Sequence, residues 1–180
     1  MSELGVGEVR VYTMQTGDRD QARVETRRIL AMLLGVADDG IELEYGPKGK
    51  PTLRTDPGLY FSVSHAQGVS MVAVTRVAHV GVDVEVVRAV PMAEAILRRF
   101  LTAEDVGEIL TDDNRDFRFV RAWTRAEATV KVRGASVWEA ATPDPSVTVR
   151  EVVAPEGYAA SVAVAASAWS VTQERWEIYR

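Results

Sequence analysis

Alternating and continuous apolar runs along the chain predict seven strands. EVRVYTM alternates between apolar and polar residues, whereas LYFSVS and GVSMVAV are short apolar runs, and both patterns are typical of strands. The predicted strands are residues 8–14, 59–64, 68–74, 79–87, 146–153, 157–166 and 169–179. Glycine and proline residues in YGPKGKPTLRTDPG, residues 45–58, predict a loop. We therefore expect the first half to form a small sheet that includes strand 79–87, and the second half to end in a β-rich tail.

Helical spacing of apolar residues predicts four helices. The first follows strand 8–14 and ends at Gly35. Thr102, with Asp105 three residues later, has the pattern of a capping box, and Asp113 is the expected cap of the longest helix. The predicted helices are residues 18–35, 91–101, 102–110 and 115–133. Both halves thus mix helices with strands, which indicates an α/β protein of the α+β type.

The length and composition of the chain limit the kinds of protein that it can be. A chain of 180 residues is long enough to bury a core in one domain or in two closely packed halves. Cysteine is absent, which excludes disulfides, thiolate metal ligands and a thiol nucleophile. No apolar run reaches membrane-spanning length, and the first residues do not have the pattern of a secretory signal. We therefore expect a cytoplasmic protein without a membrane partner.

The charge is acidic overall but basic in one place. The net charge of −5, from 21 basic and 26 acidic residues, argues against a nucleic acid partner. Between Arg115 and Arg133, however, six residues are basic and two are acidic. Four of the basic residues recur at helical spacing and form the basic stripe, Arg115, Arg118, Arg121 and Arg125. The stripe predicts either a surface for an acidic partner or an ordinary solvated helix face.

Two carboxylates interrupt the apolar segment HVGVDVEVV, residues 79–87. Side chains alternate across a strand, so Asp83 and Glu85 share one face and the valines share the other. Glu127 and Lys131 are four apart and lie on one face of the longest helix. If that helix packs beside the strand, three carboxylates converge as oxygen ligands suited to Mg²⁺. Spacing alone leaves the alternative open that Asp83 and Glu85 face solvent and that Glu127 and Lys131 form a surface pair.

Two further segments carry candidate chemistry. FSVSHAQG places Ser64 and His65 at the end of a strand, but neighbouring residues without a G-x-S-x-G sequence argue against a serine hydrolase. PKGKP offers Lys48 and Lys50, either as point charges for phosphate or as solvated surface residues. Neither of the common glycine-rich nucleotide loops is present. Phosphate binding would therefore use a different arrangement.

Four segments, in this order over residues 49 to 131, resemble the 4′-phosphopantetheinyl transferases: GKP, FSVSHAQG, GVDVE and WTRAEATVK. The similarity is to the single-chain, two-lobed type that activates the carrier proteins of peptide and polyketide synthases. It implies an enzyme that moves the phosphopantetheine arm of coenzyme A to a serine of an acidic apo carrier protein and releases adenosine 3′,5′-bisphosphate. It also implies a monomer of two similar α/β lobes related by a pseudo-twofold axis, residues 1–88 and 89–180, with the site between them.

The resemblance also assigns roles to individual residues. It implies that Asp83, Glu85 and Glu127 bind Mg²⁺, with Mn²⁺ as the alternative. It further implies that Glu127 is the base for the carrier serine and that Lys131 contacts the coenzyme A diphosphate. The remaining cofactor contacts are expected from Ser64 and His65 beside the 3′-phosphate and from the loop residues Lys48, Gly49, Lys50 and Pro51. Arg19 and Arg23 are candidates for further phosphate contacts.

One residue departs from the family pattern. The family reads W-x-x-K-E-A on this helix, whereas Ala126 here precedes Glu127. Arg125 keeps a positive charge nearby but points about 100° away around the helix. The departure leaves a second interpretation, a coenzyme A-binding homologue with impaired or lost transfer. A third interpretation is a Mg²⁺-dependent phosphotransferase that acts on another diphosphate.

Overall fold

The computed structural model describes residues 3–46, 49–54, 56, 58–135 and 144–178. The helices are α1 Arg19–Leu34, the short 3-10 helix Asp38–Gly40, α2 Ala93–Leu97, α3 Ala103–Thr111 and α4 Arg115–Val132. The strands are β1 Glu8–Gln15, β2 Leu43–Tyr45, β3 Pro51–Leu53, β4 Tyr60–Ala66, β5 Val69–Thr75, β6 Val80–Val86, β7 Thr148–Val152, β8 Tyr158–Val164 and β9 Ser170–Arg175. The α+β class is confirmed. Within the described residues, the helices lack the length and hydropathy that a membrane crossing requires.

Local signals account for several element ends. Asp18 accepts a hydrogen bond from the backbone N–H of Gln21, and Gly35 ends α1 in the left-handed region at φ 66°. Thr102 caps α3 by accepting from the backbone N–H of Asp105, as predicted. The expectation that Asp113 caps α4 was wrong. The N-cap of α4 is Asn114, whose side chain makes no capping hydrogen bond.

Two predicted segments differ from the structure in extent. The predicted loop over residues 45–58 contains β3, which pairs with β2 in a short hairpin. Only five residues of the predicted helix 91–101 are helical, as α2. Both differences concern short segments whose structure depends on tertiary contacts more than on local spacing.

The strands form two main sheets that exchange segments between the halves of the sequence. One sheet has the order β4-β5-β1-β9, in which β9 runs parallel to β1 and the other pairs are antiparallel. The other has the antiparallel order β6-β8-β7. The expectation that β6 joins the first-half sheet was therefore wrong. Strand pairing crosses the predicted boundary at residue 88, and the division into lobes 1–88 and 89–180 stays a prediction.

At the junction between the sheets, two serine hydroxyls of β4 accept hydrogen bonds from backbone N–H groups of β6, in place of backbone carbonyls. The Ser62 hydroxyl of β4 accepts from the Val82 backbone N–H of β6 at 3.1 Å. The Ser64 hydroxyl accepts from the Val84 backbone N–H at 3.3 Å. These bonds satisfy buried amides of β6 and hold β6 beside β4.

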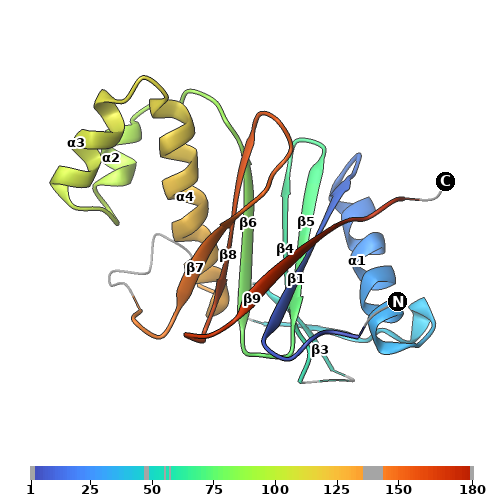
Figure 1. Ribbon diagram of the computed structural model, residues 1–180. Helices are drawn as coiled ribbons and strands as arrows, with labels where there is room; N and C mark the ends of the chain where they lie inside the picture. The colour runs from blue at the N-terminus through green and yellow to red at the C-terminus, as the bar shows by residue number, and fades with distance from the viewer. Residues whose placement is uncertain (1–2, 47–48, 55, 57, 136–143, 179–180) are drawn as a thin grey trace.

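The apolar core lies between the two sheets and beneath the outer helices. Val80, Val82 and Val84 of β6 pack in one cluster with Val9 and Val11 of β1. On the other face of the four-stranded sheet, residues of α1 pack against β1, β4 and β5. Figure 1 shows α1 and α4 on opposite sides of the molecule with the strands between them. The layers therefore place one face of β6 in the core and leave the other face to meet α4.

Glu8 fastens the first strand to the last. Its carboxylate accepts hydrogen bonds from the Arg10 guanidinium, from the Thr172 hydroxyl of β9 and from the Gly5 backbone N–H. The bond from Arg10 has the largest effect, and with Thr172 and Gly5 it outweighs burial and lowers the pKa of Glu8 from 4.5 to about 2. Only 8% of Glu8 is exposed, so this interaction bears on the stability of the fold.

We expect Glu8→Gln to lower the free energy of unfolding at pH 7 by about 3 kcal/mol, because each unit of pKa difference corresponds to about 1.4 kcal/mol. The pKa is lower in the folded state, so the stabilisation is complete above the unfolded value of 4.5 and is lost as the pH falls toward 2. Urea denaturation of the wild type and of Glu8→Gln at pH 7 and pH 3 measures the difference in their free energies of unfolding. Glu177→Gln, at an exposed pair with Arg175, is the control. A stability difference that does not narrow at pH 3 contradicts this explanation.

Candidate active site

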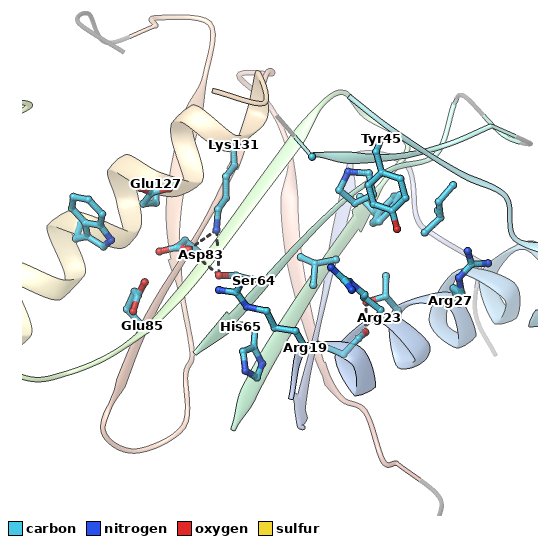
Figure 2. Close-up of a pocket in the computed structure, with 18 residues that line it drawn as sticks. Arg19, Arg23, Arg27, Tyr45, Ser64, His65, Asp83, Glu85, Glu127 and Lys131 are labelled. Carbon is cyan, nitrogen blue, oxygen red and sulfur yellow. Dashed lines mark hydrogen bonds and ion pairs between the residues drawn. The ribbon is translucent and has the colours of Figure 1, made fainter. Parts of the chain in front are cut away.

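A cavity of about 710 Å³ opens between α1 and α4, above the ends of β4 and β6. Figure 2 shows acidic side chains from β6 and α4 on one side of it and arginines of α1 on the other. The predicted site residues that border it are Gly49, Pro51, Ser64, His65, Asp83, Glu85, Glu127 and Lys131. Residues from both halves of the sequence thus meet at one cavity.

The strand β6 and the helix α4 approach each other closely because residue 81 is glycine. A methyl group at Gly81 would overlap the Ala128 carbonyl oxygen and would lie 3.0 Å from the Lys131 Cβ. Gly81, Asp83 and Glu85 share the face of β6 opposite the core valines, as the alternation predicted. The glycine therefore lets α4 lie directly over the face that carries the two carboxylates.

Asp83 is the most deeply buried acid of the site. It is 3% exposed, and its Oδ1 accepts from the Lys131 ammonium at 2.6 Å and from the Ser64 hydroxyl at 2.8 Å. Burial raises the pKa of Asp83, although the charge of Lys131 and the hydrogen bonds oppose the rise. Its Oδ2 is buried and has no hydrogen-bond partner within the described residues. A buried acceptor without a partner is costly unless something binds it.

Glu85 and Glu127 lie on either side of Asp83 in Figure 2. Burial, followed by the negative charge of Asp83, raises the pKa of both glutamates. The negative charge of Asp83 therefore acts on both glutamates. Within the described residues, no group of three or more acidic, histidine or cysteine side chains is arranged closely enough to hold a metal ion. The predicted convergence at a metal stays a prediction.

The donor set nevertheless fits a hard divalent cation. The three side chains offer only carboxylate oxygens, and one of these, Asp83 Oδ2, is buried without a hydrogen-bond partner in the part of the chain that the structure describes. The charge of Asp83 raises the pKa of both glutamates, and a cation placed among these like charges would stabilise their ionised forms. Oxygen ligands of this kind are those that Mg²⁺ prefers.

Ser64 and His65 reach the cavity but also make structural contacts that the sequence did not indicate. The Ser64 hydroxyl bridges Asp83 to the Val84 backbone, as described above. The His65 Nδ1 lies 2.8 Å from the Ser70 hydroxyl and 3.2 Å from the Thr16 hydroxyl. Ser70 and Thr16 are buried, so they fix the orientation of the ring. Only the pairing of β1, β4 and β5 brings these three residues together.

The arginines of α1 form the opposite wall. Arg19 and Arg23, the two candidates from the sequence, border the cavity together with Arg27. Arg23 pairs with Asp20 at 2.9 Å on the exposed surface, and Arg27 donates to the Ile41 carbonyl at 2.5 Å. Sequence reasoning missed Arg27, although the spacing of four residues in α1 was a signal that could have found it. The wall supplies positive charge for an anionic ligand.

The loop residues are divided between two places. Gly49 and Pro51 border the large cavity, whereas the Lys50 ammonium donates to the backbone carbonyls of Val80, Lys131 and Val132. The structure thus brings Lys50 to the end of α4 instead of into the cavity. Lys48 lies outside the described residues.

The basic stripe on α4 is largely paired within the chain. Arg118 pairs with Asp112 at 2.7 Å. Arg121 and Arg125 both approach Glu151 of β7, at 2.8 Å and 3.5 Å. Arg115 lies 3.9 Å from Asp116. Much of the positive charge that suggested an acidic partner is therefore already balanced.

The chain matches one family model over residues 79–173, and that model is described as the 4′-phosphopantetheinyl transferase superfamily. The matched range contains β6 and α4, and with them all three carboxylates and Lys131. The match rests on this half of the chain. The residues that border the cavity from α1 and β4 lie before it.

Individual relatives agree with the family match. The chain is 30% identical to the 4′-phosphopantetheinyl transferase HetI of Nostoc, over 79% of this chain and 68% of that protein. It is 30% identical to the 4′-phosphopantetheinyl transferase AcpT of Salmonella typhi and 28% identical to the 4′-phosphopantetheinyl transferase psf-1 of Bacillus pumilus. These two alignments cover 57% and 62% of this chain but only 55% and 47% of the relatives, so the chain spans about half of their lengths.

Proposed function

The chain belongs to the 4′-phosphopantetheinyl transferase superfamily, and from this premise we propose that it transfers the 4′-phosphopantetheine arm of coenzyme A to a serine of an apo acyl or peptidyl carrier protein. One observation carries the proposal. A single cavity has three carboxylates and Lys131 on one side and three arginines on the other. Such a site can hold an anionic diphosphate between cations and still offer a base to an attacking hydroxyl.

The residues of this chain divide the work between binding and proton transfer. Arg19, Arg23 and His65 face the phosphate groups of coenzyme A, and Lys131 faces the diphosphate. Glu127 takes the proton from the carrier serine, and the serine oxygen forms a bond to the phosphorus that bears the pantetheine arm. The bond from that phosphorus to the bridging oxygen breaks, and adenosine 3′,5′-bisphosphate leaves with the electron pair. Positioning of the two reactants between α1 and α4 supplies much of the rate.

Asp83, Glu85 and Glu127 would hold a divalent cation, Mg²⁺ or Mn²⁺, whose chemistry there is to neutralise charge on the diphosphate. Lys131 contributes charge of the same sign from the chain itself, and Ser64 keeps the Asp83 carboxylate in place. Because the arginines of the basic stripe on α4 are largely paired within the chain, we infer that this helix face supplies only part of the electrostatic attraction to an acidic carrier protein. We further propose that the protein works as a cytoplasmic monomer with lobes at residues 1–88 and 89–180.

The decisive experiment incubates the protein with coenzyme A, Mg²⁺ and a panel of apo carrier proteins and reads the intact mass of each carrier. We expect at least one carrier to gain one phosphopantetheinyl group, and the gain to disappear when its acceptor serine is replaced by alanine. No gain on any carrier under conditions where a known relative modifies its own carrier contradicts the proposal.

The second candidate is a coenzyme A-binding protein with impaired transfer, and Ala126 is the observation that favours it. Ala126 is half-buried on α4, where the family pattern has a lysine next to the glutamate. Calorimetric binding of coenzyme A without transfer to any carrier would support this candidate.

We expect Ala126→Lys to raise the transfer rate about tenfold, which corresponds to about 1.4 kcal/mol in the barrier, because it adds a cation beside Glu127. Ala126→Met adds similar length without charge and is the control. Initial rates at saturating coenzyme A compare the variants. A rate that is unchanged in Ala126→Lys indicates that Arg125 or Lys131 already supplies the charge.

A further inference from the structure

The Lys50 ammonium joins three segments of the chain. It donates to the Val80 carbonyl at 3.0 Å, to the Lys131 carbonyl at 2.5 Å and to the Val132 carbonyl at 3.0 Å. These three acceptors use all three of its N–H groups. Within the described residues, no carboxylate pairs with it. All three hydrogen bonds of the Lys50 ammonium therefore go to backbone oxygens.

The end of α4 explains why a cation is needed there. The Ala135 N–H bonds to the Val130 carbonyl and the Gly134 N–H bonds to the Lys131 carbonyl, with Gly134 at φ +65°. This is the hydrogen-bond pattern of a Schellman cap, and it leaves the Val132 carbonyl without a partner in the helix. Lys50 supplies that partner at the end of the helix where the dipole favours a positive charge.

Burial of the Lys50 ammonium carries a desolvation cost that an exposed lysine does not have. Burial lowers its pKa to about 8, because the charged form loses water. An ammonium held in such a place must be well satisfied by hydrogen bonds. The arrangement therefore depends on the position of all three carbonyls at once.

Each segment that meets at Lys50 contains or adjoins residues that border the cavity. Its neighbours Gly49 and Pro51 border the cavity directly. Val80 begins β6, which carries Asp83 three residues later. Lys131, whose carbonyl binds Lys50, reaches Asp83 at 2.6 Å with its ammonium. Loss of the Lys50 contacts would thus let Gly49 and Pro51 move relative to the Lys131–Asp83 pair.

We propose that Lys50 is a positioning residue for the transfer reaction, which fastens the Gly49–Pro51 segment to the C-terminal end of α4 and thereby sets Lys131 against Asp83. This inference rests on the proposed function and replaces the expectation that the Lys50 ammonium contacts a phosphate. Its effect on the reaction passes through Lys131 and the helix end.

Lys50→Met removes the ammonium and keeps most of the side-chain volume. We expect kcat to fall about tenfold and the KM for coenzyme A to change less than threefold. We also expect amide hydrogen exchange in residues 130–135 to become at least tenfold faster. Arg54→Gln, which breaks an exposed pair with Glu42, is the control and is expected to leave all three quantities unchanged.

Two results would overturn the proposal. A rise in KM with unchanged kcat and unchanged exchange would mean that Lys50 contacts the ligand directly. A loss of thermal stability with unchanged kcat and KM in the folded variant would mean that the contacts serve stability alone.

The wild-type protein gives an independent test, which decides the matter if Lys50→Met does not fold. Hydrogen exchange in residues 130–135 is measured with and without coenzyme A. Unchanged or slower exchange on binding supports the proposal, because the ammonium stays on the carbonyls. Faster exchange overturns it, because the ammonium has left them for a phosphate. If the wild type transfers nothing to any carrier, the proposed function fails, whereas the Lys50 contacts remain testable by exchange.

Discussion

Glu127→Gln is expected to lower the rate of phosphopantetheine transfer by about a thousandfold, within the range typical for loss of a general base. The substitution keeps the shape of the side chain but removes both the proton acceptor and one negative charge. Burial and the nearby Asp83 charge raise the pKa of Glu127, so its ionised form is a stronger base than an exposed carboxylate. A carboxylate at this point of α4 also faces Lys131 one turn away.

Transfer to a carrier is measured by intact mass at saturating coenzyme A, with circular dichroism to show that the variant is folded. Glu108→Gln is the matched control, because Glu108 lies on the exposed face of α3 and only approaches Arg118 at 4.0 Å. We expect the control to retain the wild-type rate. A Glu127→Gln variant within tenfold of the wild type would assign proton transfer to another group.

Gly81→Ala is expected to lower the free energy of unfolding by about 3 kcal/mol, the upper part of the range for overpacking in a core. The added methyl group would overlap the Ala128 carbonyl and would lie 3.0 Å from the Val132 nitrogen. Because these are backbone atoms of α4, the helix must move away from β6. We therefore also expect a transfer rate at least tenfold lower in the folded variant, since Lys131 would leave Asp83.

Urea denaturation and initial rates at a temperature well below the transition measure the two effects. Gly107→Ala is the control, because a methyl group at Gly107 in α3 would meet nothing within 4 Å. Alanine is favoured over glycine inside a helix, so this control is expected to gain about 0.5 to 1 kcal/mol. A Gly81→Ala protein as stable and active as the wild type would show that α4 and β6 tolerate a wider spacing.

The sequence predicted much of the site because its signals are local. Alternation in β6 separated Asp83 and Glu85 from the core valines, and helical spacing placed Glu127 and Lys131 on one stripe of α4. The resemblance then related the strand to the helix, which spacing alone had left open. Asp18 and Thr102 cap the starts of α1 and α3, and Gly35 ends α1, all through contacts within three or four residues.

The features that the sequence did not predict depend on partners far along the chain. Nothing near Lys50 in the sequence indicates that its ammonium meets the end of a helix 81 and 82 residues later. The strand pattern of β6 is the same whether it pairs with β4 or with β8, so the division into two sheets was not readable. The parallel pairing of β9 with β1 and the paired charges of the basic stripe depend in the same way on tertiary contacts.

The position of β9 beside β1 has a consequence for how the protein is made. As the ribosome releases the chain, the first-half sheet has an open edge at β1 until residues 170–175 emerge. Trp176 then completes the closure, because its indole N–H donates to the buried Glu25 carboxylate of α1 at 2.8 Å. Since α1 carries the arginines that border the cavity, this side of the cavity takes its final form only after residues 170–176 have been synthesised. Residues 8–34 and 170–176 therefore belong to one folding unit, and the cavity is complete only when both segments are in place.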